Sequence, residues 1–168
     1  LINCENALKE AGCTNITLGA YSPNYFFPGV DFENYPLAIR FFEERGYASQ
    51  EKHYSMGKNL HGYRIPEGTL QKQREAEKKG YQFVRFDYKY TLELLEFLRI
   101  EFGGGWKRNA LIAMQNETAE DVILLVLNKG GNICGFCMRA IDGNPMRFGP
   151  IGVAESERNA GIGGILLE

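Results

Sequence analysis

The last third of the sequence places three strand-like segments close together and ends in a glycine-rich stretch. The segments 121–128, 132–141 and 146–154 are rich in apolar and β-branched residues. Gly130-Gly131 separates the first two, and Asp142-Gly-Asn-Pro145 separates the last two. Because such short connections join antiparallel neighbours, the pattern predicts a three-stranded antiparallel meander.

Helices and further strands are predicted ahead of the meander. In 35–45, Leu37, Phe41 and Phe42 recur at helical spacing, whereas 66–79 is polar all round and reads as a solvated connector. Thr91 is a suitable cap for a helix with a broad apolar face. The predicted helices are 5–11, 35–45, 66–79, 91–102 and 106–115, and the predicted strands are 15–21, 47–56 and 81–88.

Length and charge limit the possible partners. The chain has 168 residues and a formal charge of -2, so no strong field draws it to nucleic acid or to an anionic membrane. Its longest apolar runs, such as 122–127, are far shorter than the roughly 20 residues that span a bilayer, and no secretory signal is visible. We expect a cytoplasmic protein with a small-molecule or peptide partner.

Two cysteines have the spacing of a redox pair or of half a zinc site. Cys134 and Cys137 fall within the predicted strand 132–141, where residues three apart point to opposite faces. Neither a disulfide nor chelation is easy in that geometry, so we expect structural thiols and no metal site. A thiol redox or metal protein is the least favoured alternative.

The glycine-rich stretch after the last predicted strand is suited to binding phosphate. Gly161, Gly163 and Gly164 open a short apolar helical segment. Glycines let the backbone approach a ligand closely, and free N–H groups at a helix start attract phosphate oxygens. The pattern is neither the nucleotide triphosphate loop nor the dinucleotide fingerprint. The bland alternative is a tight strand-to-helix turn with incidental glycines.

This stretch resembles the signature of the GNAT superfamily of N-acetyltransferases, Val-x-Pro-x-x-Arg-x-x-Gly-x-Gly. Val153, Arg158, Gly161 and Gly163 match it, and Glu155 stands where proline is common. The segment 38–47 is similar to the Ala-x-x-Phe-Tyr-x-x-x-Gly-Phe helix of the family's C-terminal part. The resemblance implies an α/β fold of the α+β type, in which helices flank a mixed, mostly antiparallel sheet.

The two resembling segments come in reversed order. We expect one composite GNAT-like domain over 1–168, in which 1–60 supplies C-terminal-half elements and 81–168 supplies N-terminal-half elements with the CoA loop. The segment 61–80 would be a linker and solvated helix. The order fits either a circularly permuted unit or one period of a tandem GNAT protein.

The resemblance also implies direct transfer of an acetyl group from acetyl-CoA to an amine of a small molecule or peptide. Strand-end backbone groups would hold the pantetheine arm, and the glycine-rich loop would hold the pyrophosphate. The implied cofactor-binding residues are Gly152, Val153, Arg158, Asn159, Ala160, Gly161, Ile162, Gly163 and Gly164. The loop 21–27 and the turn 103–107 lie where the family builds its acceptor groove.

The catalytic groups are less clearly marked. Glu155 is the preferred general base and Glu157 the alternative, although both are ordinary charges for a helix start. The resemblance implies a tyrosine that acts as general acid and protonates the leaving thiolate, but Phe42 occupies its position. Tyr35 is our preferred substitute, and Tyr25 and Tyr47 are the alternatives. The thiolate could also leave without a proton donor. A degenerate unit that senses acyl-CoA or has a structural role is therefore the second hypothesis, with a homodimer or a partner GNAT unit as its context.

Overall fold

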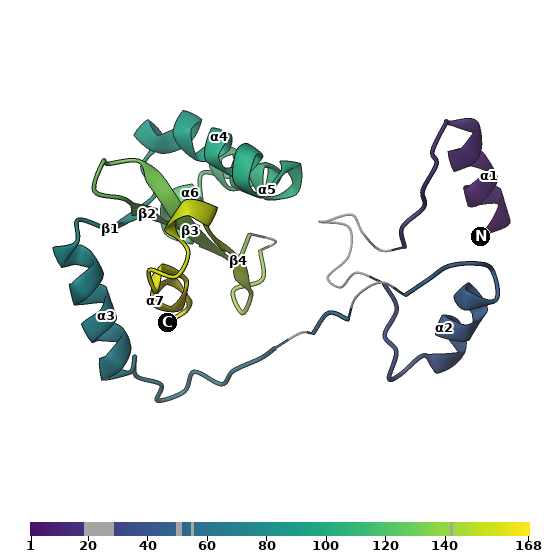
Figure 1. Cartoon of the computed structure of the whole chain (residues 1–168), viewed down its shortest axis with the longest axis horizontal. Helices are drawn as coiled ribbons and strands as arrows, with labels where there is room; N and C mark the ends of the chain where they lie inside the picture. The colour runs from purple at the N-terminus through teal and green to yellow at the C-terminus, as the bar shows by residue number, and fades with distance from the viewer. Residues whose placement is uncertain (19–28, 50–51, 55, 142) are drawn as a thin grey trace. The chain divides into compact units, whose positions relative to one another are not determined.

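The computed structural model describes residues 1–18, 29–49, 52–54, 56–141 and 143–168, and the chain divides into two compact units, 1–59 and 60–168 (Figure 1). Each unit is described by itself. Among the described residues, no helix combines the length and the apolar character needed to cross a membrane.

The second unit is built on a four-stranded antiparallel sheet. Its strands are β1 (Gln82–Arg85), β2 (Ile123–Leu127), β3 (Ile133–Arg139) and β4 (Phe148–Val153), and they lie side by side in chain order. β2 pairs with both β1 and β3, and β3 pairs with β4. The predicted meander and the predicted strand before it are confirmed, each with shorter bounds.

Helices cover both faces of this sheet (Figure 1). One face packs on α4 (Thr91–Glu101), α5 (Gly104–Gln115) and the short α6 (Ala119–Val122), and the core there includes Leu94, Leu98 and Phe136. The other face packs on α7 (Ile162–Leu167), which buries Ile162 and Leu166, and α3 (Glu67–Lys78) lies against α7. The sheet is therefore the middle layer of three.

The cysteines of β3 lie on one face of the sheet, so the expectation of opposite faces was wrong. The register between β2 and β3 shifts between Val126 and Leu127, where Val126 pairs with Gly135 but Leu127 pairs with Ile133. The extra residue in β3 is Cys134, and a bulge of this kind breaks the alternation of side chains. Cys134 and Cys137 consequently share one apolar cluster, and both are free thiols.

Helix α4 is fixed at both ends to the same rim of the sheet. Near its start, Glu93 Oε1 accepts a hydrogen bond from the backbone N–H of Ile133 at 2.6 Å. At its last residue, Glu101 Oε2 accepts one from the backbone N–H of Glu155 at 3.1 Å. The two carboxylates thus satisfy backbone donors at the start of β3 and just beyond the end of β4. Thr91 is the first helical residue rather than the cap, and its hydroxyl donates to the carbonyl of Tyr88.

The first unit contains α1 (Ile2–Glu10) and α2 (Pro36–Glu43). Phe42 of α2 contacts Tyr47 edge to face at 5.6 Å, and the Tyr47 hydroxyl donates to Glu5 Oε1 at 2.8 Å, which joins the two helices. None of the residues described between 1 and 59 is buried. The strands predicted over 15–21 and 47–56 do not form in their described residues, and the remainder of both segments lies outside the described residues.

Candidate functional site

The candidate loop connects β4 to α7 through backbone conformations that few residues adopt. A single 3-10 turn, η2 (Glu155–Glu157), follows β4, and the chain then passes through Asn159 at φ 69° and Gly161 at φ 81°. Asparagine and glycine are the residues that tolerate this left-handed region best. Gly161 is the N-cap residue of α7, so the sequence itself directs the sharp entry into the helix.

A pocket of about 270 Å³ opens along this loop. It is lined by Val153, Glu157, Arg158, Asn159, Gly161, Ile162, Gly163 and Gly164. Every predicted cofactor-binding residue except Gly152 and Ala160 is therefore among the residues that line the pocket.

The protein's own packing does not require glycine at the helix start. A Cβ added at Gly164 would meet no atom within 4 Å, and one at Gly163 would meet only Val153 Cγ2 at an ordinary 3.8 Å. Glycine in a helix is nevertheless less stable than alanine, by up to about 1 kcal/mol. The missing side chains leave the backbone open toward the pocket, which is the property that a phosphate loop needs.

Gly152 serves a different purpose from the loop glycines. A Cβ at Gly152 would lie 2.6 Å from Phe102 Cζ and 2.9 Å from Phe136 Cε1. Phe102 stacks on Trp106 with their ring centroids 4.9 Å apart, and Phe136 meets both rings edge to face. Gly152 is thus required because aromatic rings pack directly on the backbone of β4.

Arg158 forms a hydrogen bond with the backbone of its own loop. Its Nε donates to the carbonyl oxygen of Val153 at a long 3.5 Å, and the side chain lines the loop pocket. This contact links the two ends of η2 and keeps the guanidinium group at the pocket.

The two glutamates of η2 differ in their surroundings. Glu155 is exposed, and its backbone N–H is held by Glu101. Glu157 is half-buried and accepts a 2.5 Å hydrogen bond from the hydroxyl of Tyr81. This bond, with burial, raises the pKa of Tyr81 to about 12. Sequence reasoning missed Tyr81, because it lies 76 residues from Glu157 and no local pattern connects them.

The aromatic candidates of the first unit also differ from one another. Tyr35 precedes the first residue of α2 and is 64% exposed. The hydroxyl of Tyr47 donates a hydrogen bond to Glu5, and that hydrogen bond raises the pKa of Tyr47. Tyr25 and the whole loop 21–27 lie outside the described residues.

The predicted 103–107 turn is shorter than expected. Gly103, at φ 82°, is the N-cap of α5, and Gly104 and Gly105 are already helical. Only Phe102 and Gly103 separate α4 from α5.

Burial keeps the thiols of Cys134 and Cys137 in their protonated form. Burial raises the pKa of both Cys134 and Cys137 to about 11, so both are protonated at neutral pH. In the part of the chain that the structure describes, no three side chains of His, Cys, Asp or Glu gather closely enough to hold a metal ion.

The protein belongs to the α+β class, because helices cover both faces of an antiparallel sheet. A glycine-lined pocket follows the fourth strand of this sheet. No family model and no curated protein matches the sequence. A solved structure does match, with a TM-score of 0.73 and 20% sequence identity, over 98% of this chain and 22% of that chain. It is described as a GCN5-related glucosamine N-acetyltransferase region in a fungal multi-domain GH3 β-N-acetylglucosaminidase.

This likeness confirms the predicted fold class: the chain has the fold of the GCN5-related N-acetyltransferases. It spans 22% of the length of the matching chain.

Proposed function

We propose that the chain uses acetyl-CoA to acetylate an amine of a small molecule or peptide. The observation that carries this proposal is the glycine-lined pocket at the β4–α7 loop, within the GCN5-related fold. The open backbone of Gly161 to Gly164 would hold the pyrophosphate, and Arg158 would add a positive charge beside it.

The edge of β4 would hold the rest of the acyl donor. β4 is the last strand of the described sheet and pairs with β3 along one edge. The pantetheine arm would lie along its other edge, where backbone groups near Gly152 and Val153 would bind the arm and polarise the thioester carbonyl. Because Phe102 and Phe136 pack on Gly152, this backbone would be rigid before the donor arrives.

In the proposed reaction the acceptor nitrogen attacks the thioester carbon. A C–N bond forms as the C–S bond breaks, the nitrogen loses a proton to a base, and the thiolate of CoA leaves. We propose Glu155 as the base, since its carboxylate is exposed beside the loop, and Tyr35 as the donor of a proton to the thiolate. A Glu155→Gln variant should lose about 100-fold in kcat, because a positioned general base contributes about that much to the rate.

For the acceptor we propose a primary amine, with amino sugars as the first class to test. This choice is supported by the matching solved structure, which is described as a glucosamine N-acetyltransferase region. A cytoplasmic location stays a prediction, which cell fractionation would test.

We also propose that 1–60 and 81–168 belong to one composite domain. This is supported by the extent of the structural match, which at 98% of the chain includes residues of both units. The composite domain should unfold in urea as one transition, whether followed by the fluorescence of Trp106 or by a probe attached to Cys4. Two separate transitions would refute it. The native mass would separate a permuted unit from one period of a tandem protein.

The second candidate function is a unit that binds acyl-CoA without catalysis. It is favoured by Phe42, which packs against Tyr47 and has no proton to give. Such a unit would act beside a partner GNAT unit or a second copy of the chain.

Calorimetric titration with acetyl-CoA tests both functions. The proposed enzyme binds acetyl-CoA and releases thiol with at least one amine of a panel that includes glucosamine. Binding without thiol release on any amine favours the non-catalytic unit. Absence of acetyl-CoA binding by the full-length protein refutes both.

A further inference from the structure

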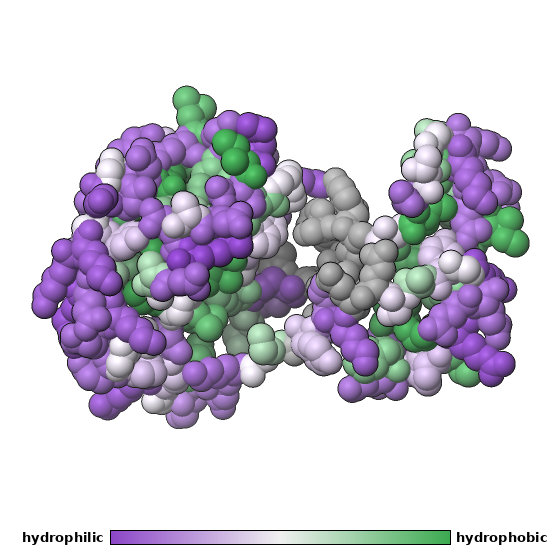
Figure 2. Space-filling model, viewed as in Figure 1, coloured by the Kyte–Doolittle hydropathy of each residue, from purple (hydrophilic) through white to green (hydrophobic). Residues whose placement is uncertain are grey.

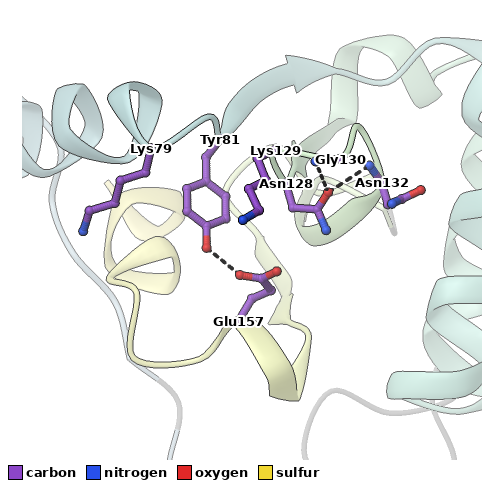
Figure 3. Close-up of a pocket in the computed structure, with 7 residues that line it drawn as sticks. All are labelled: Lys79, Tyr81, Asn128, Lys129, Gly130, Asn132 and Glu157. Atoms are coloured by element: carbon purple, nitrogen blue, oxygen red, sulfur yellow. Dashed lines mark hydrogen bonds between the residues drawn. The ribbon is translucent and has the colours of Figure 1, made fainter.

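A second pocket lies beside the loop pocket and shares one wall with it. Its volume is about 470 Å³, and it is bounded by the end of α3, the start of β1, the turn between β2 and β3, and η2. Figure 3 shows the residues that line it: Lys79, Tyr81, Asn128, Lys129, Gly130, Asn132 and Glu157. Glu157 also lines the loop pocket, so a ligand that occupies one pocket lies next to the other.

The fold brings two lysines from distant segments to this pocket. Lys79 caps the C-terminal end of α3, and Gly80 follows at φ 96°. A Cβ at Gly80 would lie 2.8 Å from Lys129 Cβ, so the backbone of Gly80 packs directly on the β2–β3 turn. Asn128 Oδ1 fixes that turn by accepting the N–H groups of Gly130 at 2.9 Å and Asn132 at 3.1 Å.

The pocket has an excess of positive charge. Within the described residues, neither Lys79 nor Lys129 forms an ion pair, and both side chains are exposed. The opposing carboxylate, Glu157, is occupied by the hydroxyl of Tyr81 (Figure 3). The lining of the pocket thus holds two lysines and one carboxylate, and that carboxylate already accepts a hydrogen bond.

We propose that this pocket binds a second phosphate group of the nucleotide whose pyrophosphate occupies the loop pocket. The inference rests on the proposed function, in which the nucleotide is acetyl-CoA. CoA carries a monophosphate on its ribose 3′-oxygen besides its pyrophosphate, and such a group bears close to two negative charges at neutral pH. Lys79 and Lys129 supply ammonium donors for it, one from each side of the Gly80 contact.

The test compares CoA with dephospho-CoA, which lacks only the 3′-phosphate. The wild-type full chain should bind CoA about 10-fold more tightly than dephospho-CoA at low salt, and 0.5 M NaCl should reduce this ratio. Lys79→Ala and Lys129→Ala should each weaken CoA binding about 3-fold to 5-fold and leave dephospho-CoA binding unchanged. The double variant, with both lysines replaced, should bind CoA and dephospho-CoA with nearly equal affinity.

Lys78→Ala is the matched control, because Lys78 is an exposed neighbour on α3 that does not line the pocket. It should bind both nucleotides as the wild type does. Since all three lysines are exposed, thermal unfolding should be nearly unchanged in every variant.

The outcomes separate this assignment from the proposed function. If the wild type binds CoA and dephospho-CoA equally, or if the double variant keeps the preference, the assignment is refuted and the proposed function stands. If neither nucleotide binds, the proposed function is refuted and the assignment falls with it.

Discussion

Replacement of Gly161 by alanine would separate two reasons for a glycine at this position: its left-handed backbone conformation and the close approach of a ligand to that backbone. Gly161 has φ 81° and ψ 0°, and a Cβ added to it would meet no atom of the protein within 4 Å. The substitution therefore creates no clash inside the protein. Its effects are restricted to backbone strain and to whatever occupies the loop pocket.

The backbone strain can be sized from the conformation alone. An L-residue in the left-handed region is less stable there by about 1–2 kcal/mol. For a composite domain of 168 residues that unfolds in one transition, a loss of about 1 kcal/mol lowers the Tm by about 2–4 °C. The effect on ligand binding is additional, because the new methyl group would stand in the pocket where the backbone meets the pyrophosphate.

The assay combines urea unfolding with calorimetric titration of acetyl-CoA. Gly161→Ala should lose about 1 kcal/mol of stability and at least about 10-fold in affinity, a factor equivalent to about 1.4 kcal/mol. Gly161→Asn should regain part of the stability, because asparagine tolerates the left-handed region, but none of the affinity.

Gly143→Ala is the matched control for these variants. Gly143 has φ 80° and the same open surroundings, and it lies in the β3–β4 turn, away from the loop. It should lose similar stability and keep its affinity. Wild-type affinity in a folded Gly161→Ala protein would refute the close approach of ligand and backbone.

Three further predictions concern the core and the rim of the sheet. Gly152→Ala should lose about 1–3 kcal/mol in urea unfolding because its Cβ meets two aromatic rings, and Phe102→Leu should recover part of that loss; additive effects would contradict the contact. Tyr81→Phe should lose about 1 kcal/mol at pH 7 with the hydrogen bond to Glu157, and an unchanged urea midpoint would show that the bond contributes nothing. The thiols of β3 have pKa values raised from 9.0 to about 11, so their contribution to stability is complete below pH 9 and is lost as the pH rises through 11. Unfolding curves between pH 8 and 11 should show this decline, and Cys137→Ala should reduce its slope; an identical slope in the variant would contradict the assignment to that thiol.

The sheet was predictable because its strands are marked by the pattern of their own residues. β2, β3 and β4 are apolar runs between turn residues, and a local pattern is sufficient to find them. Helix α6 was missed because its four residues continue directly into β2, and its last two, Asp121 and Val122, were assigned to the predicted strand 121–128. The bulge at Cys134 was missed because a register shift depends on the partner strand.

The candidate site was predictable to the extent that it is continuous in sequence. The loop from Val153 to Gly164 carries its own signature, and the structure gathers most of it around one pocket. The second pocket, lined by Lys79, Lys129 and Glu157, draws these residues from three segments. They come together only through the pairing of strands and the contact of Gly80 with the β2–β3 turn. No sequence pattern reports such a contact.

The two hydrogen bonds of α4 attach that helix to the strand ends beside the loop. Glu93 and Glu101 are eight residues apart, which corresponds to about 12 Å along a helix axis. The N–H groups of Ile133 and Glu155 lie on neighbouring strands, next to the point where the N–H of Ala154 donates to the carbonyl of Cys134 at 2.8 Å. Helix α4 therefore adds a second attachment, outside the strand pairing, at the place where the chain leaves β4 for the loop. One added residue in the middle of α4 would turn Glu101 by about 100° and remove its carboxylate from the N–H of Glu155. The entry of the loop would then lose its hydrogen bond to α4 while the sequence of the loop stayed intact.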